Sequence, residues 1–237
     1  MAIWNPWRGC KKYSEGCKYC YIHKGDYKKN IDTNMIVKTK DFYKPVEKYK
    51  NGNYKIKSGI VYVCFSSDFL IKEADLWREE CFKMIKQRND LTFLFLTKRI
   101  DRFLECIPND WNDGYDNVIV CTTVENQITA DYRLSILENL PIKHKCITAQ
   151  PLLENLNIEK YLKNIDLVVV GGESDYNARN FDYDWVLNIR KQCQNTNTNF
   201  EFRQYGSYTI KNGDRKYYKT YELCKKARED KLNYRVK

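Results

Sequence analysis

The sequence predicts an α/β fold built on parallel strands, and two observations support this prediction. Short apolar runs alternate with amphipathic stretches along most of the chain, a pattern typical of βα units. The apolar runs are nearly continuous in apolar and β-branched residues, as expected for strands buried on both faces. No long Pro-, Gly- or Ser-rich linker interrupts the alternation, so we expect the βα units to form one domain. The pattern fits an open doubly wound sheet or a complete or partial βα barrel.

The predicted strands are short, and the predicted helices lie between them. The strands are predicted at 60–65, 92–96, 117–121, 145–148, 167–170 and 200–203, and a further short strand is predicted at 2–4 before them. The helices cover 75–88, 126–139, 182–195 and, as a last and basic helix, 215–230. Six main strands are fewer than the eight of a complete barrel, so a barrel of this length is expected to be partial.

Polar residues follow nearly every predicted strand directly. They are Ser66-Ser67-Asp68, Thr97-Lys98-Arg99, Thr122-Thr123-Val124-Glu125, Gln150, Gly171-Gly172-Glu173-Ser174 and Gln204. In a barrel the carboxyl ends of all strands converge on one mouth, whereas an open sheet uses mainly the ends at its switch point. Functional groups after so many strands therefore favour a barrel.

Charge is distributed unevenly along the 237 residues, whose formal net charge is +10. Residues 1–57 hold 14 Lys and Arg against 5 Asp and Glu, and residues 203–237 hold 11 against 4, whereas residues 58–202 hold 16 against 22. Two basic ends on an acidic centre predict a polyanionic partner such as nucleic acid; a Lys-rich surface that serves solubility is the alternative. No apolar run reaches the roughly 18 to 20 residues of a membrane span, and the N-terminus lacks the apolar segment of a secretion signal. We therefore expect a cytoplasmic protein.

The strongest chemical signal is a loop with three cysteines, Cys10-x6-Cys17-x2-Cys20. Three thiolates can hold three irons of a 4Fe-4S cluster and leave the fourth iron open for a substrate or a second cofactor. His23 follows Cys20 by three residues, so a closed Cys3His zinc site is the second interpretation. The third is coincidence among the ten cysteines of the chain.

The loop ends in Cys-x-aromatic-Cys, with Tyr19 before Cys20, and in this it resembles the cluster loop of radical S-adenosylmethionine enzymes. The usual spacing of that loop has three residues between the first two cysteines, and this chain has six. Residues 3–208 resemble an uncharacterised bacterial and phage family that is distantly similar to spore photoproduct lyase. The matching motifs include Trp4-Asn5-Pro6-Trp7, Gly16-Cys17-Lys18-Tyr19-Cys20-Tyr21, Leu96-Thr97-Lys98-Arg99, Gly171-Gly172-Glu173-Ser174 and Arg203-Gln204-Tyr205-Gly206. Where the family usually has Glu before Pro-Leu-Leu, this chain has Gln150.

The resemblance implies a partial (β/α)6 barrel of radical-SAM type over 1–208, with the cluster loop at 8–23 and a basic helical extension over 209–237. It implies a 4Fe-4S cluster held by Cys10, Cys17 and Cys20, together with S-adenosylmethionine. The enzyme would generate a 5′-deoxyadenosyl radical and act on nucleic acid or a nucleotide. Its electron donor would be a flavodoxin or a ferredoxin.

The resemblance also implies roles for the polar residues after the strands. Lys98 or Arg99 would pair with the methionine carboxylate. The ribose hydroxyls would be bound by one or more of Ser66, Asp68, Thr123 and Glu125. Gly171 and Gly172 would allow a close backbone approach, and Glu173 would accept a hydrogen bond from the adenine or the amine.

Each of these residues also has a plain structural interpretation. Lys98-Arg99 can be an ordinary helix start, Gly171-Gly172 an ordinary turn, and Glu125-Asn126 the cap of the helix that follows. Two other functions remain open beside the enzyme. One is a non-catalytic nucleic-acid-binding protein with structural zinc, and the other is an iron–sulfur protein that senses redox state or transfers electrons.

Overall fold

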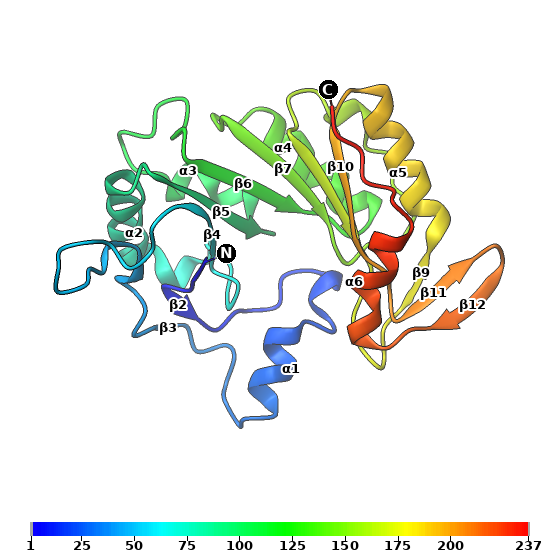
Figure 1. Ribbon diagram of the computed structural model, residues 1–237, viewed down its shortest axis with the longest axis horizontal. Helices are drawn as coiled ribbons and strands as arrows, with labels where there is room; N and C mark the ends of the chain where they lie inside the picture. The colour runs from blue at the N-terminus through cyan, green and yellow to red at the C-terminus, as the bar shows by residue number, and fades with distance from the viewer. Residues whose placement is uncertain (1, 237) are drawn as a thin grey trace. The chain divides into compact units, whose positions relative to one another are not determined.

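The computed structural model describes residues 2–236 and contains a seven-stranded sheet in the order β1-β4-β5-β6-β7-β8-β10 (Figure 1). Its strands are β1 (Ala2–Trp4), β4 (Gly59–Val63), β5 (Leu91–Thr97), β6 (Val118–Thr123), β7 (His144–Ala149), β8 (Leu167–Gly171) and β10 (Asn199–Gln204). Every strand expected from the apolar runs is present, including the short one at 2–4, and the bounds differ by at most two residues.

The order of the strands in space follows their order in the chain, and this decides between the two expected architectures. Strands β4 and β5 pair in parallel, as do β7 and β8, and β10 pairs in parallel with β8. A doubly wound sheet reverses its strand order at a switch point, and this sheet does not reverse. The fold is a mixed α/β fold of the partial (β/α) barrel type, as predicted.

The helices lie largely between the strands of the sheet, with α1 before β4 and α6 after β10. They are α1 (Tyr21–Tyr27), α2 (Asp75–Gln87), α3 (Phe103–Cys106), α4 (Gln127–Glu138), α5 (Tyr183–Asn195) and α6 (Thr220–Glu229). Two small sheets complete the fold, one of β2 (Trp7–Arg8) with β3 (Val37–Lys38), and one in the order β12-β11-β9. Within residues 2–236, no helix has the length and apolar character that a membrane crossing requires.

The chain divides into two compact units. The first consists of Met1–Tyr13, Cys20–Cys121 and Leu140–His144, and the second of Ser14–Tyr19, Thr122–Asn139 and Lys145–Lys237. Of the three loop cysteines, Cys10 and Cys20 belong to the first unit and Cys17 to the second. The division into a barrel over 1–208 and an extension over 209–237 stays a prediction.

The predicted last helix over 215–230 is wrong in its first part. Residues 208–217 form a hairpin of β11 (Tyr208–Lys211) and β12 (Asp214–Tyr217), which pairs with β9 (Asn180–Asp182), and α6 begins after it, at Thr220. The two residues at the turn, Asn212 and Gly213, have φ values of 55° and 80°. Asn-Gly with positive φ at both positions is the typical two-residue hairpin turn, so the signal was present in the sequence.

Candidate functional site

The three cysteines of the loop are thiols and form no disulfide bond with one another. Cys10 and Cys20 are half-buried, and Cys17 is buried at the end of a short 3-10 helix (Glu15–Cys17). Over the described range 2–236, no group of three His, Cys, Asp or Glu side chains lies close enough together to hold a metal ion. The loop therefore supplies thiol donors, and the structure gives them no coordination geometry.

His23, the fourth donor of the zinc interpretation, lies half-buried on α1. Burial lowers the pKa of its imidazole, and the nearby Lys12 ammonium lowers the pKa further. A lowered pKa favours the neutral imidazole, which is the form that can bind a metal. The Cys3His site stays a prediction.

In the first unit, serines after β4 hold the chain that leads into the cysteine loop. The Ser66 hydroxyl donates to the Trp7 carbonyl oxygen at 2.9 Å, and the Ser67 hydroxyl donates to the Gly9 carbonyl oxygen. Gly9 has a φ of 91°, and a Cβ at this position would overlap the Met35 carbonyl oxygen. Ser66, a predicted ribose ligand, thus bonds the backbone three residues before Cys10, and Ser67 bonds it directly before Cys10.

Asp68 is the most fully hydrogen-bonded of the predicted site residues of the first unit. Its Oδ1 accepts from the Leu70 amide at 2.9 Å and the Thr97 hydroxyl at 2.8 Å. Its Oδ2 accepts from the Lys98 amide and from Arg99 Nη1, both at 3.0 Å. The Asp68 carboxylate therefore joins the segment after β4 to the segment after β5 in a buried ion pair.

Arg99 carries this ion pair to the cysteine loop. While Nη1 binds Asp68, Nη2 donates to the Lys11 carbonyl oxygen at 2.8 Å. The guanidinium also lies over the Tyr13 ring, 4.8 Å from its centroid. Arg99 is buried with Asp68, so these contacts fix the residues that follow Cys10.

Lys98 precedes Arg99 in the chain, but its side chain is not part of the ion pair with Asp68. Its backbone amide binds Asp68, but within the described part of the chain its half-buried ammonium makes no ion pair or hydrogen bond. Of the two residues expected to pair with a carboxylate, Lys98 thus has the available cation, and Arg99 is already paired.

In the second unit, Glu125 after β6 is completely buried and paired with a buried arginine. Glu125 Oε2 lies 2.8 Å from Arg133 Nη1, which also donates to the Thr123 carbonyl oxygen at 2.7 Å. Glu125 Oε1 accepts from the Gly16 amide at 3.3 Å. The predicted ribose ligand Glu125 therefore binds the backbone of the cysteine loop next to Cys17. The hydroxyl of Thr123 makes no hydrogen bond that the described residues account for.

The residue after Glu125 caps α4, as one of the structural interpretations predicted. The Asn126 side-chain oxygen accepts a hydrogen bond from the Thr129 amide at 2.9 Å, and the Thr129 hydroxyl oxygen accepts one from the Asn126 amide at 3.1 Å. This reciprocal arrangement satisfies amides that the first helical turn leaves open. The end of β6, the buried Glu125 carboxylate and the cap of α4 thus lie within four residues of the chain, 123–126.

Glu173 after β8 is also engaged by an arginine. Its Oε2 accepts from the Arg179 amide at 2.9 Å and from Arg179 Nε at 3.1 Å. Arg179 reaches the cysteine loop as well, because Nη1 donates to Glu15 Oε1 at 2.9 Å and Nη2 to the Glu15 carbonyl oxygen at 3.1 Å. The contact with the loop thus passes from Glu173 through Arg179 to Glu15.

The glycine pair before Glu173 is packed against other parts of the second unit. A Cβ on Gly172 would overlap the backbone of Gly206, and a Cβ on Gly171 would lie 2.9 Å from the Gln150 side chain. The Gln204 amide nitrogen donates to the Gly172 carbonyl oxygen at 2.7 Å. The close approach that the two glycines permit is therefore made, at least in part, by the protein itself.

The structure thus gathers the predicted residues in two sets. Ser66, Asp68, Lys98 and Arg99 lie together in the first unit, and Glu125, Gly171 and Glu173 belong to the second, as does Thr123. Sequence reasoning missed the two arginines that complete the second set. Arg133 lies in the buried stripe of α4, where a charge among apolar positions was a usable signal. Arg179 lies in an irregular segment without any periodic signal.

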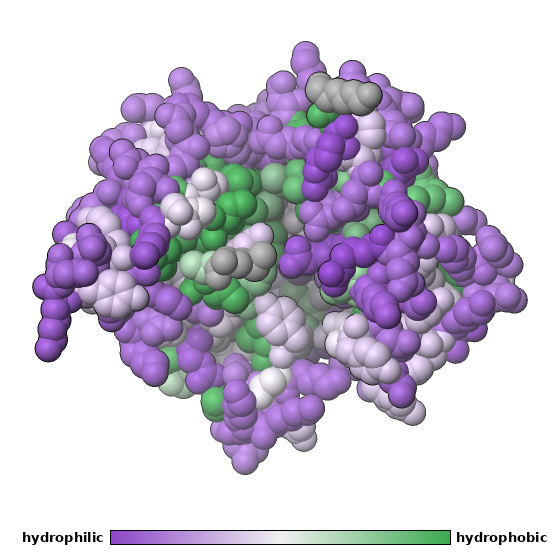
Figure 2. All heavy atoms as spheres, viewed as in Figure 1, coloured by the Kyte–Doolittle hydropathy of each residue, from purple (hydrophilic) through white to green (hydrophobic). Residues whose placement is uncertain are grey.

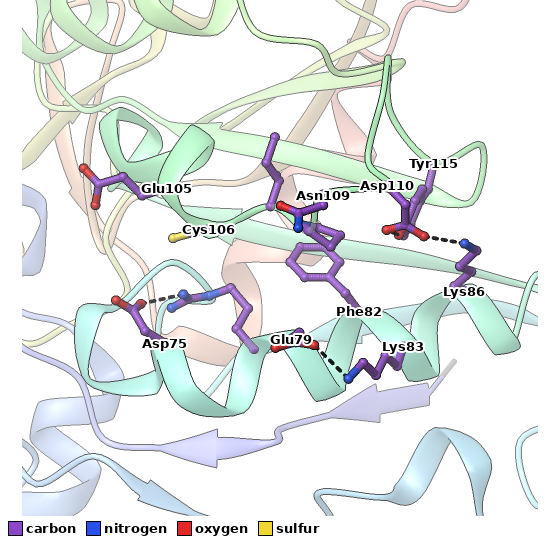
Figure 3. A pocket seen from close by; sticks show the side chains of 13 residues that line it. Asp75, Glu79, Phe82, Lys83, Lys86, Glu105, Cys106, Asn109, Asp110 and Tyr115 are labelled. Carbon is purple, nitrogen blue, oxygen red and sulfur yellow. Dashed lines mark hydrogen bonds and ion pairs between the residues drawn. The ribbon is translucent and has the colours of Figure 1, made fainter.

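A pocket of about 540 Å³ lies elsewhere in the first unit, between α2 and residues 105–115 (Figure 3). Phe82 forms part of its wall, and the charges around it are paired. Lys83 bonds Glu79 at 2.7 Å, and Lys86 bonds Asp110. None of the predicted site residues lines this pocket, so it is separate from the residues that hold the cysteine loop.

Comparison with solved structures supports the fold. One solved structure that is similar to the chain is a mutant of spore photoproduct lyase with dinucleoside spore photoproduct. The match has a TM-score of 0.50 and 15% sequence identity, and it covers 95% of this chain and 70% of that chain. No curated protein matches the sequence. A family model described as "Protein of unknown function (DUF5131)" matches residues 1–236, and the chain belongs to this family.

Proposed function

We propose that the chain is a radical S-adenosylmethionine enzyme that acts on nucleic acid. The observation that carries this proposal is the cysteine loop, whose backbone is held by the polar residues that follow the strands of a partial barrel. These contacts are made with carbonyl oxygens, an amide and the Glu15 carboxylate, and none of them involves a cysteine sulfur. The similarity of fold to a spore photoproduct lyase supports the same reaction class.

The chemistry of the donors fits an iron–sulfur cluster. Three thiolates, from Cys10, Cys17 and Cys20, are the ligand set of a cluster that keeps one iron open. The loop also contains a buried hydroxyl, Ser14 Oγ, that has no hydrogen-bond partner within residues 2–236. When bound, the cluster would supply the electron that cleaves the sulfonium of S-adenosylmethionine. We propose that the protein's part is to bind that cofactor and exclude water.

The structure favours some of the predicted cofactor ligands over others. Lys98 has an unengaged ammonium, so we propose that it binds the methionine carboxylate. Asp68 and Arg99 already satisfy one another, and they act by fixing Lys11 and Tyr13. In the second unit, Thr123 is the candidate for a ribose hydroxyl.

The proposal is tested by anaerobic purification, metal analysis and electron paramagnetic resonance of the reduced protein. We expect about four irons per chain and a signal that shifts when S-adenosylmethionine is added. The triple variant Cys10→Ala, Cys17→Ala, Cys20→Ala should lose both, and Cys224→Ala, a half-buried cysteine outside the loop, should lose neither. Cofactor cleavage by the triple variant would overturn the proposal.

The same experiment separates the rival functions. One zinc per chain and no iron, with the zinc weakened in His23→Ala, would establish the structural zinc site. A cluster whose spectrum ignores the added cofactor would establish a redox or sensor protein. Either result would overturn the enzyme hypothesis in favour of the corresponding rival function.

Nucleic acid is proposed as the partner because cations and aromatic rings lie together on the β11–β12 hairpin. Arg215 lies over the Tyr208 ring, 4.2 Å from its centroid, and the rings of Tyr208 and Tyr217 are 5.2 Å apart. All four residues of β12 are exposed. In Figure 2 the surface over the hairpin and α6 is mostly purple and pale lilac, the colours of hydrophilic and weakly hydrophilic residues. Such surfaces bind single-stranded nucleic acid by stacking and by phosphate contact.

The affinity for a fluorescently labelled single-stranded oligonucleotide tests this part. We expect Arg215→Ala/Lys216→Ala to weaken binding about tenfold and to lower the slope of log affinity against log salt by about 1.4, because each phosphate contact on a single strand contributes about 0.7. Lys163→Ala/Lys191→Ala removes the same charge from the same unit at exposed positions outside the hairpin. Equal loss in both variants would show attraction by net charge alone and would overturn the hairpin's role.

A further inference from the structure

We infer that Arg179 is a positioning residue that holds the turn around Cys17 for metal loading. The inference deepens the proposed function and rests on it for the identity of the metal group. The placement of the turn itself is a property of the protein without metal, so it can be measured separately.

The guanidinium of Arg179 is fixed on one side by Glu173. The Arg179 amide and Nε both donate to Glu173 Oε2, at 2.9 and 3.1 Å, and Nη2 bonds Glu173 Oε1. Glu173 is buried two residues after the end of β8, so the carboxylate is anchored to the sheet. A planar guanidinium bound through two of its edges has little freedom left.

The other edge of the guanidinium forms hydrogen bonds with Glu15 of the cysteine loop. Nη1 bonds the Glu15 carboxylate at 2.9 Å, and Nη2 bonds the Glu15 carbonyl oxygen at 3.1 Å. Glu15 begins the 3-10 helix that ends at Cys17. The guanidinium also lies over the Tyr19 ring, 5.6 Å from its centroid. Arg179 therefore contacts the residues two before and two after Cys17.

This arrangement suits Arg and no other residue. Lysine has one nitrogen, which cannot bond the Glu173 carboxylate, the Glu15 carboxylate and the Glu15 carbonyl oxygen in the same geometry. Glu125 supports the same turn through the Gly16 amide, but it does so from a fully buried pair. Arg179 is the partly exposed support, so its removal is expected to loosen the turn without unfolding the unit.

The first test uses the metal-free, reduced protein. Alkylation of each loop cysteine by iodoacetamide is followed by mass spectrometry, together with hydrogen exchange of residues 14–19. Cys17 is buried in the wild type. We expect Arg179→Met to speed both alkylation of Cys17 and exchange at Gly16 about tenfold, the effect of losing a charge-assisted bond to the loop. Alkylation of Cys10, which is held by groups of the first unit, should not change.

Arg190→Met is the matched control. Arg190 is a half-buried arginine of the same unit that bonds the Leu232 carbonyl oxygen at 2.8 Å, far along the chain from the loop. It should leave Cys17 alkylation at the wild-type rate. Arg179→Lys keeps the positive charge but lacks the planar guanidinium with its several N–H donors. Compared with Arg179→Met, it should restore less than half of the slowing of Cys17 alkylation and Gly16 exchange, measured on a logarithmic scale of rate.

The second test loads the proteins with iron and sulfide. We expect Arg179→Met to bind several-fold less iron and to broaden the electron paramagnetic resonance signal of what it binds, and Arg190→Met to match the wild type. Unchanged Cys17 alkylation and exchange in Arg179→Met would overturn the inference. If the wild type binds no iron, the proposed function fails, and the metal-free measurements still decide whether Arg179 holds the turn.

Discussion

The two units hold their parts of the cysteine loop by similar chemistry with different exposure. In the first unit, Asp68 and Arg99 are both buried, and Arg99 binds the Lys11 carbonyl oxygen. In the second, Glu173 is buried, but the side chain of Arg179 is 22% exposed and that of Glu15 is 60% exposed. The first support is part of the core and forms when the unit folds. The second lies at the surface, where a local opening can release it without global unfolding.

A carboxylate that follows a strand and its arginine partner can therefore have either of two effects, depending on their burial. Where both are buried, the pair fixes the position of a loop and is expensive to break. Where one is exposed, the contact contributes little to global stability but still orders the residues that it touches. The difference predicts which substitutions unfold the protein and which alter the loop alone.

The largest expected effect is the loss of a buried charge partner. Glu125→Gln leaves Arg133 without its charge partner, and Asp68→Asn does the same to Arg99. We expect each to lower the free energy of unfolding by about 3 kcal/mol, because a buried charge loses its compensation. Urea unfolding monitored by circular dichroism measures this. Arg179→Met should cost less than about 1 kcal/mol in the same assay.

If Arg179→Met lowers the free energy of unfolding as much as Asp68→Asn does, the proposed difference between the two supports is wrong. The exposed support would then belong to the core of its unit. The double variant Glu125→Leu/Arg133→Leu provides an internal check, since removing both charges should cost less than removing one.

The strands of this fold could be predicted because their sequence pattern and their environment agree. Strands buried on both faces need continuous apolar residues, and each such run became a strand of the sheet. Strands β2, β3 and β9 have only two or three residues each, which is too short for any period to show. Their pairing is decided by the segments that flank them.

The helix faces and the arginine partners were harder to predict. In α4 the apolar Ile128 is 80% exposed, whereas Arg133 is buried in the stripe with Leu134 and Leu137. Tertiary pairing with Glu125 overrides the apolar pattern here. The strand-end carboxylates were recognised as candidates, but their arginines come from a helix and an irregular loop. Nothing in local sequence spacing links Glu173 to Glu15 through Arg179.

An intermediate effect is expected at the backbone before Cys10. Gly9 has a positive φ, and a Cβ there would overlap the Met35 carbonyl oxygen. We expect Gly9→Ala to lower the free energy of unfolding by about 2 kcal/mol or more, through backbone strain and overlap together. Gly52→Ala is the control in the same unit, because Gly52 has a φ of 84° and nothing within 4 Å of the added Cβ.

Gly52→Ala should cost about 1 kcal/mol, the strain of the backbone conformation alone. The difference between the two variants isolates the packing of Gly9 against the segment that contains Met35. Equal costs would mean that the backbone before Cys10 can move away from that segment, and the first unit's support would then be as adaptable as the second's.

The smallest expected effect lies at the exposed edge of the first unit's support, where Lys11 bonds Glu73. The hydrogen bond from Lys11 lowers the pKa of the Glu73 carboxyl below its ordinary value of 4.5. A lowered pKa in the folded state adds stability above the unfolded pKa, and this stability is lost as the pH falls through the folded value. Both side chains are more than a third exposed, so we expect at most about 0.5 kcal/mol at pH 7. Lys11→Met should raise the pKa of Glu73 toward 4.5, as measured by carbon NMR titration of the carboxyl group.

The Lys11→Met variant also separates the two contacts that Lys11 makes. Its carbonyl oxygen still accepts from Arg99, so alkylation of Cys10 should keep the wild-type rate even though the ion pair with Glu73 is gone. Lys83→Met, which breaks the exposed pair with Glu79 on the same unit, should leave the pKa of Glu73 unchanged. If Lys11→Met exposes Cys10 as Arg179→Met is expected to expose Cys17, then surface ion pairs order the loop in both units. The buried Asp68–Arg99 pair would in that case set the stability of the first unit without setting the position of its cysteine.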